Sequence, residues 1–179
     1  VAAYARPKIA VPPAPTLDEA IAKRVGFLTD YQDAAYAERY RTQVEKIRAA
    51  EAAINSSQLT EAVAHNLFKL MAIKDEYEVA RLYAETDFLQ RIGERFEGDY
   101  TLQFHLAPPL LSPVNDVTGK PRKLAFGAWM QSAFRLLAPL KILRGTPLDV
   151  FGYTQERRRE RQLIADYRAL IESLLQKLN

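Results

Sequence analysis

The sequence predicts a mainly α-helical fold of about five to six helices with one minor β element. Apolar residues recur every three to four positions through most of the 179-residue chain, as they do in helices that bury one face. One short segment near residues 100–107 instead alternates apolar and polar residues, which is typical of a half-buried strand. A chain of this length has the size of one domain, so we expect these elements to share a single core.

The first fifteen residues differ from the rest because four prolines lie among alanines and valines. Proline fixes φ and removes an amide donor, so we interpret residues 1–15 as a linker or extended arm ahead of a helical domain over residues 16–179. Val1 in place of methionine favours a processed chain or a piece excised from a larger protein. Thr16 and Glu19 have the spacing of a capping box, which predicts that the first helix begins directly after Thr16.

Three helices are expected in the first half of the chain. The first covers residues 17–25 and is predicted to end at Gly26, a residue type common just after helices. The second covers residues 29–54, and an Asn-Ser-Ser run then separates it from a third helix over residues 59–83. The apolar stripe that supports the second helix consists of Tyr36, Tyr40, Val44, Ile47 and Ile54.

The second half of the chain begins with a helical piece over residues 88–96, followed by the predicted strand. Two prolines end the strand, and the polar run over residues 108–124 is predicted to be an exposed loop or hairpin tip. A further helix is expected over residues 126–137, and Pro139 should kink or restart it.

Thr154 is predicted to cap the last helix, over residues 155–178. Its apolar stripe is the clearest in the chain and is predicted to face the core; the stripe consists of Leu163, Tyr167, Leu170, Leu174 and Leu178. Trp129, Phe126 and Phe134 are large and rigid, and we expect them to fill the core between helices.

Composition excludes several classes of protein. Hydrophobic residues make up 48% of the chain and charged residues 26%, which is typical of a folded domain. The absence of cysteine excludes disulfides, thiol nucleophiles and thiolate-bound metals, and two histidines are too few for a multi-histidine metal site. No segment has the length of a membrane span or the pattern of a signal peptide, so we expect a cytoplasmic protein without a membrane partner.

The net charge of +3 is unevenly distributed, with +1 over residues 1–60, −5 over 61–119 and +7 over 120–179. This asymmetry indicates a polar face that meets partners, although solvated helix surfaces of both signs would give the same count. The strongest charged feature is the run at 157–161. If it is helical, Arg157 and Arg161 share a face and Arg158 neighbours Arg161.

Two candidate sites follow from these residues. Arg157, Arg158 and Arg161 could dock an acidic protein or bind phosphate, because guanidinium groups suit both; the alternative is a basic turn paired with acidic neighbours. His105 lies on the polar side of the predicted strand, beside a Pro-Pro loop, and is a candidate cleft residue. The chain lacks a nucleophile elbow, a zinc-protease helix and a dinucleotide-binding loop, and nothing in it matches a nucleic-acid-binding module.

Three stretches of the chain resemble a known family. They contain the strings KDEYEVARL at 74–82, FEGDY at 96–100, FHLAPPL at 104–110, FGAWM at 126–130, LRGT at 143–146, FGYT at 151–154 and ERRRER at 156–161. Over roughly residues 24–179, they resemble the C-terminal domain of the large single-chain bacterial indolepyruvate ferredoxin oxidoreductases. Members of this family decarboxylate aryl 2-oxoacids oxidatively with thiamine diphosphate, Mg²⁺ and iron–sulfur clusters, and pass the products to coenzyme A and ferredoxin.

The resemblance implies a non-catalytic accessory domain. The chain has no cysteine for a cluster, and its Gly98-Asp99 pair lacks the second glycine of the thiamine diphosphate motif, so no catalytic, cofactor-binding or metal-binding residue is carried over. We expect the domain to pack against the catalytic domains or a neighbouring subunit, and the three arginines to dock ferredoxin. The matching strings support this expectation because they include polar residues where the internal fold needs little; these are Asp75, Glu76, His105, Arg144 and Arg157.

Two other classes remain open. A stand-alone helical binding module would use the basic last helix, and its affinity for nucleic acid would fall steeply with salt. A self-sufficient enzyme would place His105 in a concave site beside a partner with a perturbed pKa.

Overall fold

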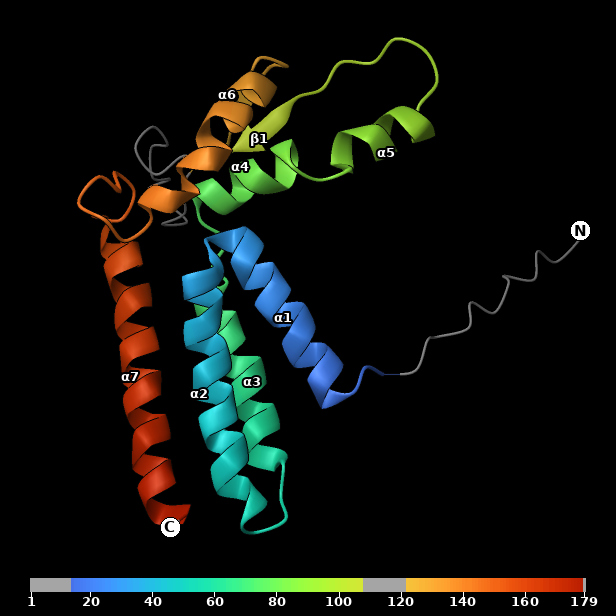
Figure 1. The fold of residues 1–179 in the computed structure, drawn as a ribbon. Helices are drawn as coiled ribbons and strands as arrows, with labels where there is room; N and C mark the ends of the chain where they lie inside the picture. Colours follow the sequence, from blue (N-terminus) through green and yellow to red (C-terminus); the bar gives the residue numbers. More distant parts are fainter. Residues whose placement is uncertain (1–13, 108–121, 179) are drawn as a thin grey trace, which may run out of the picture.

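The computed structural model describes residues 14–107 and 122–178, and within them the fold is mainly helical (Figure 1). Seven α-helices, one 3₁₀ helix and a two-stranded antiparallel sheet form the described part, which confirms the predicted mainly α fold with a minor β element. Almost all of the predicted arm at 1–15 and of the predicted loop at 108–124 lies outside the described residues.

Four helices form an elongated bundle. They are α1 (Leu17–Tyr31), α2 (Ala34–Ala52), α3 (Gln58–Met71) and α7 (Gln155–Leu178). Figure 1 shows α2, α3 and α7 running lengthwise with α1 inclined against them. One buried cluster joins all four; its largest fully buried members are Tyr40, Leu28, Ile47, Leu67, Met71 and Ile171. Burial of each such side chain stabilises the fold by roughly 1.5–3 kcal/mol.

The remaining elements form a second layer across one end of the bundle. They are α4 (Glu76–Ala84), α5 (Phe88–Arg95), β1 (Phe104–Leu106), β2 (Leu124–Phe126), α6 (Met130–Leu137) and the 3₁₀ helix η1 (Ala138–Leu143). The strands pair with Phe104 opposite Phe126 and Leu106 opposite Leu124. A separate aromatic core forms here, because the rings of Phe104, Tyr83 and Phe134 contact one another.

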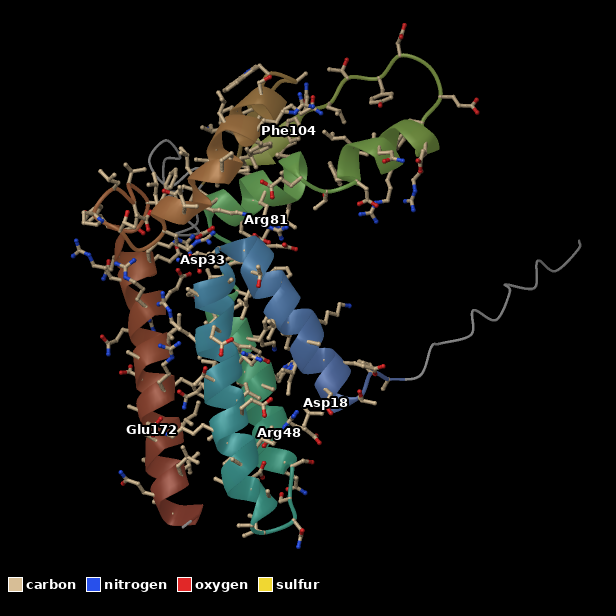
Figure 2. All side chains as sticks on the ribbon, in the orientation of Figure 1. Asp18, Asp33, Arg48, Arg81, Phe104 and Glu172 are labelled. Carbon is tan, nitrogen blue, oxygen red and sulfur yellow. The ribbon has the colours of Figure 1, made fainter. Side chains whose placement is uncertain are left out.

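Ion pairs lie between and along the helices, and Figure 2 labels Arg48, Arg81 and Glu172 of three of them. Arg48 on α2 reaches Asp18 on α1 at 2.6 Å, and Glu172 on α7 meets α2 through Lys46. Arg81 on α4 makes a buried two-bond contact with Glu78 and places its guanidinium 5.4 Å from the ring centre of Phe27 on α1. The buried pair therefore lies where the second layer meets the bundle, and the exposed pairs add little stability.

The predicted boundaries of the first helix are correct at its start and wrong at its end. The backbone amide of Glu19 donates to the Thr16 hydroxyl, and the Glu19 carboxylate accepts from the Thr16 amide, which completes the capping box. The helix continues through Gly26 to Tyr31, and Asp33 caps the next helix in place of Thr29. A glycine inside a helix costs about 1 kcal/mol relative to alanine, which the burial beyond it offsets.

The predicted third helix, residues 59–83, is also wrong as a single element. It ends at Met71, and Asp75 begins α4 by accepting a hydrogen bond from the amide of Glu78 at 2.8 Å. Phe126, predicted to be helical, pairs in β2, so that α6 begins only at Met130. Pro139 restarts the chain as predicted, in the 3₁₀ helix.

The last helix is capped as predicted, since the Thr154 hydroxyl accepts from the amide of Arg157. The predicted core face is correct only in part: Tyr167 packs against the bundle core, whereas Leu163 and Leu170 are 46% and 50% exposed, and the buried side chains are Ile171 and Leu175. Successive side chains on a helix point about 100° apart. The stripe that contains Ile171 and Leu175 is shifted by one position from Leu163 and Leu170, and it faces the core in their place.

The aromatic residues predicted for the core divide between core and surface. Phe134 is buried as expected, whereas Trp129 is 62% exposed and contacts the edge of the Phe126 ring. Trp129 directly precedes α6 and is therefore not part of the helix face that buries Met130 and Phe134. Among the described residues, no helix combines the length and the apolar character that a membrane crossing requires.

Candidate functional site

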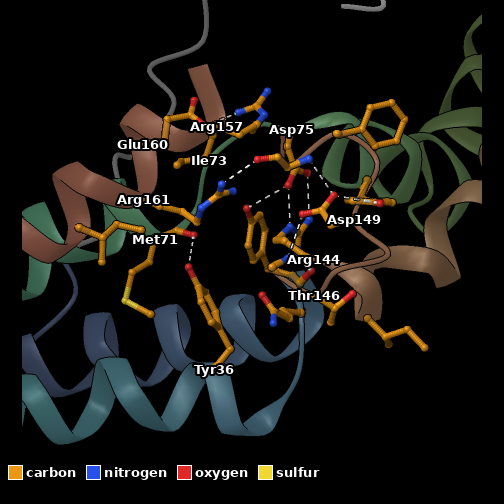
Figure 3. Close-up of a pocket in the computed structure, with 18 of the residues that line it drawn as sticks. Tyr36, Met71, Ile73, Asp75, Arg144, Thr146, Asp149, Arg157, Glu160 and Arg161 are labelled. Atoms are coloured by element: carbon orange, nitrogen blue, oxygen red, sulfur yellow. Dashed lines mark hydrogen bonds and ion pairs between the residues drawn. The ribbon is translucent and has the colours of Figure 1, made fainter. Parts of the chain in front are cut away.

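A cavity of about 530 Å³ lies where the bundle meets the second layer (Figure 3). The C-terminal end of α1, the first turns of α2 and the segment between α3 and α4 form one side of this cavity. The loop over residues 144–152 and the first half of α7 form the other side. Segments far apart in the sequence therefore supply its walls, and charged and aromatic side chains dominate them.

Asp75 and Arg144 form the central ion pair of the cavity. Arg144 Nε and Nη2 donate to the two oxygens of Asp75 at 2.6 and 2.9 Å, and Nη1 donates to the carbonyl of Tyr31 at 2.6 Å. The guanidinium lies 3.7 Å from the centre of the Tyr31 ring. Burial lowers the pKa of Arg144, but the hydrogen bonds to Asp75 and the neighbouring charges outweigh it and raise that pKa.

The Tyr31 hydroxyl donates to Asp75 at 3.4 Å, which ties the end of α1 to this pair. Burial, the larger cause, and the charge of Asp75, the smaller one, raise the pKa of Tyr31 above its usual range, so the hydroxyl stays protonated. Tyr36 donates to the carbonyl of Met71 at 3.0 Å, and its pKa is also raised by burial. The tyrosines therefore act as hydrogen-bond donors.

Asp149 organises the loop that covers the cavity. One carboxylate oxygen accepts from the Gly152 amide and the Tyr77 hydroxyl, at 3.0 and 3.2 Å, and the other accepts from the Gly145 amide at 2.9 Å. Burial, followed by the charge of Asp149, raises the pKa of Tyr77 to about 12. A Cβ atom on Gly152 would lie 2.5 Å from Asp149 Oδ2, so only glycine fits this turn.

Arg157 makes the second ion pair of the cavity. It lies 3.6 Å from Glu76 at the start of α4 and also bonds Glu160 on its own helix. Burial raises the pKa of Glu76, and the charge of Arg157 opposes this effect only in part. Glu76 Oε2 is buried without a hydrogen-bond partner among the described residues.

Three more arginines line the cavity, and the described residues offer them no carboxylate partner. Arg161 on α7 donates to the carbonyl of Gly152 at 2.7 Å. Arg39 on α2 places its guanidinium 5.6 Å from the centre of the Tyr36 ring. Arg168 on α7 has a buried Nε atom without a hydrogen-bond partner. The cavity thus holds three arginines that form no ion pair within the described residues; Arg39 and Arg161 are also exposed to solvent, and Arg168 is half-buried.

The structure separates the residues predicted for partner docking. Arg157 points inward to its ion pairs, Arg161 lines the cavity, and Arg158 is exposed on the outer side of α7. His105 is exposed on β1 opposite Ala125, outside the cavity.

Four polar residues of the matching strings serve the internal fold, contrary to the sequence interpretation. Asp75 pairs with Arg144, and Glu76 pairs with Arg157, so each supports a contact between distant segments. Among the described residues, no group of three or more acidic or histidine side chains could hold a metal ion.

Sequence reasoning did not identify Arg39, Arg168, Tyr36 or Asp149. Arg39 and Arg168 are isolated basic residues on amphipathic helices, a pattern shared with ordinary solvated arginines. Asp149 had a weak local signal, because an acidic residue between glycines is typical of a turn that the carboxylate stabilises. The convergence of these residues depends on how α2 and α7 pack.

The comparison with protein families gives one match, which spans residues 17–179. The matching family is described as a family of unknown function, DUF6537. No curated protein and no solved structure matches the chain. The match begins with α1 and includes every helix, both strands and the whole cavity lining. The chain therefore belongs to the DUF6537 family.

Proposed function

We propose that the chain is a non-catalytic domain of a thiamine diphosphate-dependent 2-oxoacid:ferredoxin oxidoreductase, and that it packs against the catalytic part of that enzyme. The observation that carries the proposal is an apolar surface on the segment 136–153, which comprises the end of α6, η1 and the following loop. Its exposed residues are Leu136, Leu140, Ile142, Leu148, Val150 and Tyr153.

Exposed apolar side chains are concentrated in this part of the sequence. Leu136, Leu148 and Ile142 are 76%, 69% and 65% exposed, and Val150 is 61% exposed. Seven of the thirteen large hydrophobic residues exposed in the described part lie between residues 129 and 153. Concentrations of this kind mark surfaces that partners cover, and covering one such side chain contributes roughly 1.5–3 kcal/mol.

The resemblance supplies the identity of the partner. The string LRGT at 143–146 lies within the apolar segment, and FGYT at 151–154 overlaps its end. Arg144 in the first string binds Asp75, and the carbonyl of Gly152 in the second accepts from Arg161 on α7. The shared residues thus build the surface that the proposal uses. The parent reaction, with its thiamine diphosphate, iron–sulfur clusters and coenzyme A, belongs to the catalytic part, and this chain contributes no group to it.

The test is a purification of the tagged chain from the organism that encodes it. The eluate is assayed for thiamine diphosphate and for indole-3-pyruvate-dependent reduction of ferredoxin. We expect the oxidoreductase to elute with the chain, on the same polypeptide or as a partner, and the assembly to fail when Leu148→Asp and Val150→Asp are combined.

Ile54→Asp provides the matched control. Ile54 is 52% exposed, and it follows α2 at the end of the bundle away from the apolar segment (Figure 1). This variant should assemble like the wild-type chain. An eluate without thiamine diphosphate and without activity would refute the parentage, and equal assembly of the two variants would refute the role of the apolar segment.

A further inference from the structure

We propose that the cavity between α2 and α7 binds a small organic molecule that carries a carboxylate or phosphate group. Arg39, Arg161 and Arg168 line this cavity from two helices, and Figure 3 shows Arg161 in its wall. Guanidinium groups bind carboxylate and phosphate oxygens through paired, charge-assisted hydrogen bonds. This inference goes beyond the proposed function, because it uses the cavity and not the exposed apolar segment.

The carboxylates of the cavity are already committed to the fold. Asp33 caps α2, Asp75 binds Arg144, and Asp149 accepts three hydrogen bonds from the loop and Tyr77. The other two, Glu76 and Glu160, share Arg157. None of these carboxylates forms an ion pair with the three arginines, and Glu76 Oε2 is the one buried carboxylate oxygen among the described residues that also has no hydrogen-bond partner.

Arg168 shows most directly that a partner is missing. Its Nε atom is buried and makes no hydrogen bond within the described residues. A buried donor without a partner costs roughly 1–3 kcal/mol, and more when it belongs to a charged group. An oxyanion in the cavity that reached this guanidinium after a small shift of the side chain would offset this penalty.

The shape and lining of the cavity restrict the ligand. A volume of about 530 Å³ lies within the range of sites for small organic molecules. Met71, Ile73 and Ile164 add apolar walls beside the arginines, so the ligand should have an apolar body as well as an anionic group. Formal charges in the lining balance, with five arginines and five carboxylates, so long-range attraction of a polyanion such as nucleic acid is not favoured.

The experiment uses the whole chain and three matched probes, which are phenylacetate, phenyl phosphate and 2-phenylethanol. Isothermal titration calorimetry at low ionic strength measures affinity, and thermal unfolding gives an independent readout of binding. We expect at least one of the two anions to bind and 2-phenylethanol not to bind. The comparison of phenylacetate with phenyl phosphate identifies which acid group the cavity prefers.

Variants assign the binding to the cavity. Arg168→Gln should weaken anion binding by at least about tenfold, because it removes a charge-assisted contact. Arg39→Gln, on the opposite wall, should have a similar effect and serves as the second variant if Arg168→Gln unfolds. Arg159→Gln is the matched control, since Arg159 is an exposed arginine of the same helix outside the cavity lining.

Three results would overturn the inference. One is no heat and no thermal shift with either anion up to about 10 mM, which is weaker than the affinity of a specific site. Another is equal binding of 2-phenylethanol. The last is an anion affinity that changes equally little in all three variants, so that Arg168→Gln and Arg39→Gln have no larger effect than the control Arg159→Gln. Leu148→Asp with Val150→Asp should leave anion binding intact, so failure of the docking proposal is distinguishable from failure of this one.

Discussion

Replacing Arg144 with methionine tests whether the central ion pair holds the two layers together. The side chain links the loop after η1 to Asp75 and to the last carbonyl of α1, so one residue connects three segments. Methionine keeps most of the aliphatic volume but removes every hydrogen bond. Asp75, which is 5% exposed, would then hold a buried charge without its cation.

The expected loss follows from these contacts. Removal of one partner from a buried ion pair costs roughly 3–5 kcal/mol, because the remaining charge is desolvated and unpaired. The contact of the guanidinium with the Tyr31 ring, at 3.7 Å, adds to this cost. Domains of this size have total stabilities of roughly 5–15 kcal/mol, so Arg144→Met should remove a large fraction of the stability.

Urea unfolding followed by circular dichroism measures this loss. The matched control is Arg41→Met, because Arg41 forms an ion pair with Glu38 in which both side chains are more than half exposed. Such exposed pairs contribute at most about 1 kcal/mol. The double variant with Asp75→Asn should recover part of the stability by removing the unpaired charge. Equal losses for Arg144→Met and Arg41→Met would refute the reasoning.

Further predictions concern the loop, the cavity acid and the basic helix. In the same urea assay, Gly152→Ala should destabilise the fold by roughly 1–3 kcal/mol, because the added Cβ atom clashes with Asp149. Gly26→Ala should stabilise the fold by roughly 0.5–1 kcal/mol, because the added Cβ atom there meets no atom within 4 Å. Because burial raises the pKa of Glu76 above its ordinary 4.5, the stability present below that pH is lost as pH rises through the folded-state pKa; Glu76→Gln should remove this loss, and its urea midpoint should gain on the wild type as pH rises above 4.5. In the oxidoreductase, Arg158→Glu should slow ferredoxin-dependent turnover and flatten its dependence on salt; an unchanged rate and slope would contradict ferredoxin docking at the exposed end of α7.

Local features of the fold were predictable because their causes lie within a few residues. Thr16 and Thr154 cap the first and last helices as their sequence context indicates. The alternation around Phe104 predicts the strand, although only three residues of it pair. Gly26 misled the prediction, because the conformational preference of one residue is smaller than the burial on either side of it.

The candidate site was predictable only in fragments. Asp75, Glu76, Arg144 and Arg157 were recognised as unusual polar positions, but their pairing in two inward ion pairs was not. Each pair joins residues about 70 or 80 positions apart, and no local pattern encodes which partner a charged side chain will meet. Arg168 gave no signal at all.

The sequence by itself determined that the fold is mainly helical, where the first and last helices begin, and that the chain has no thiol and only two histidines to bind a metal. Only the tertiary structure decided which face of α7 is buried, that Trp129 is exposed, and that arginines of α2 and α7 meet around one cavity. The physical reason is the sequence separation between the residues that interact. Capping and backbone hydrogen bonds form between residues within one helical turn, whereas burial and charge pairing depend on neighbours that the packing of distant helices brings together.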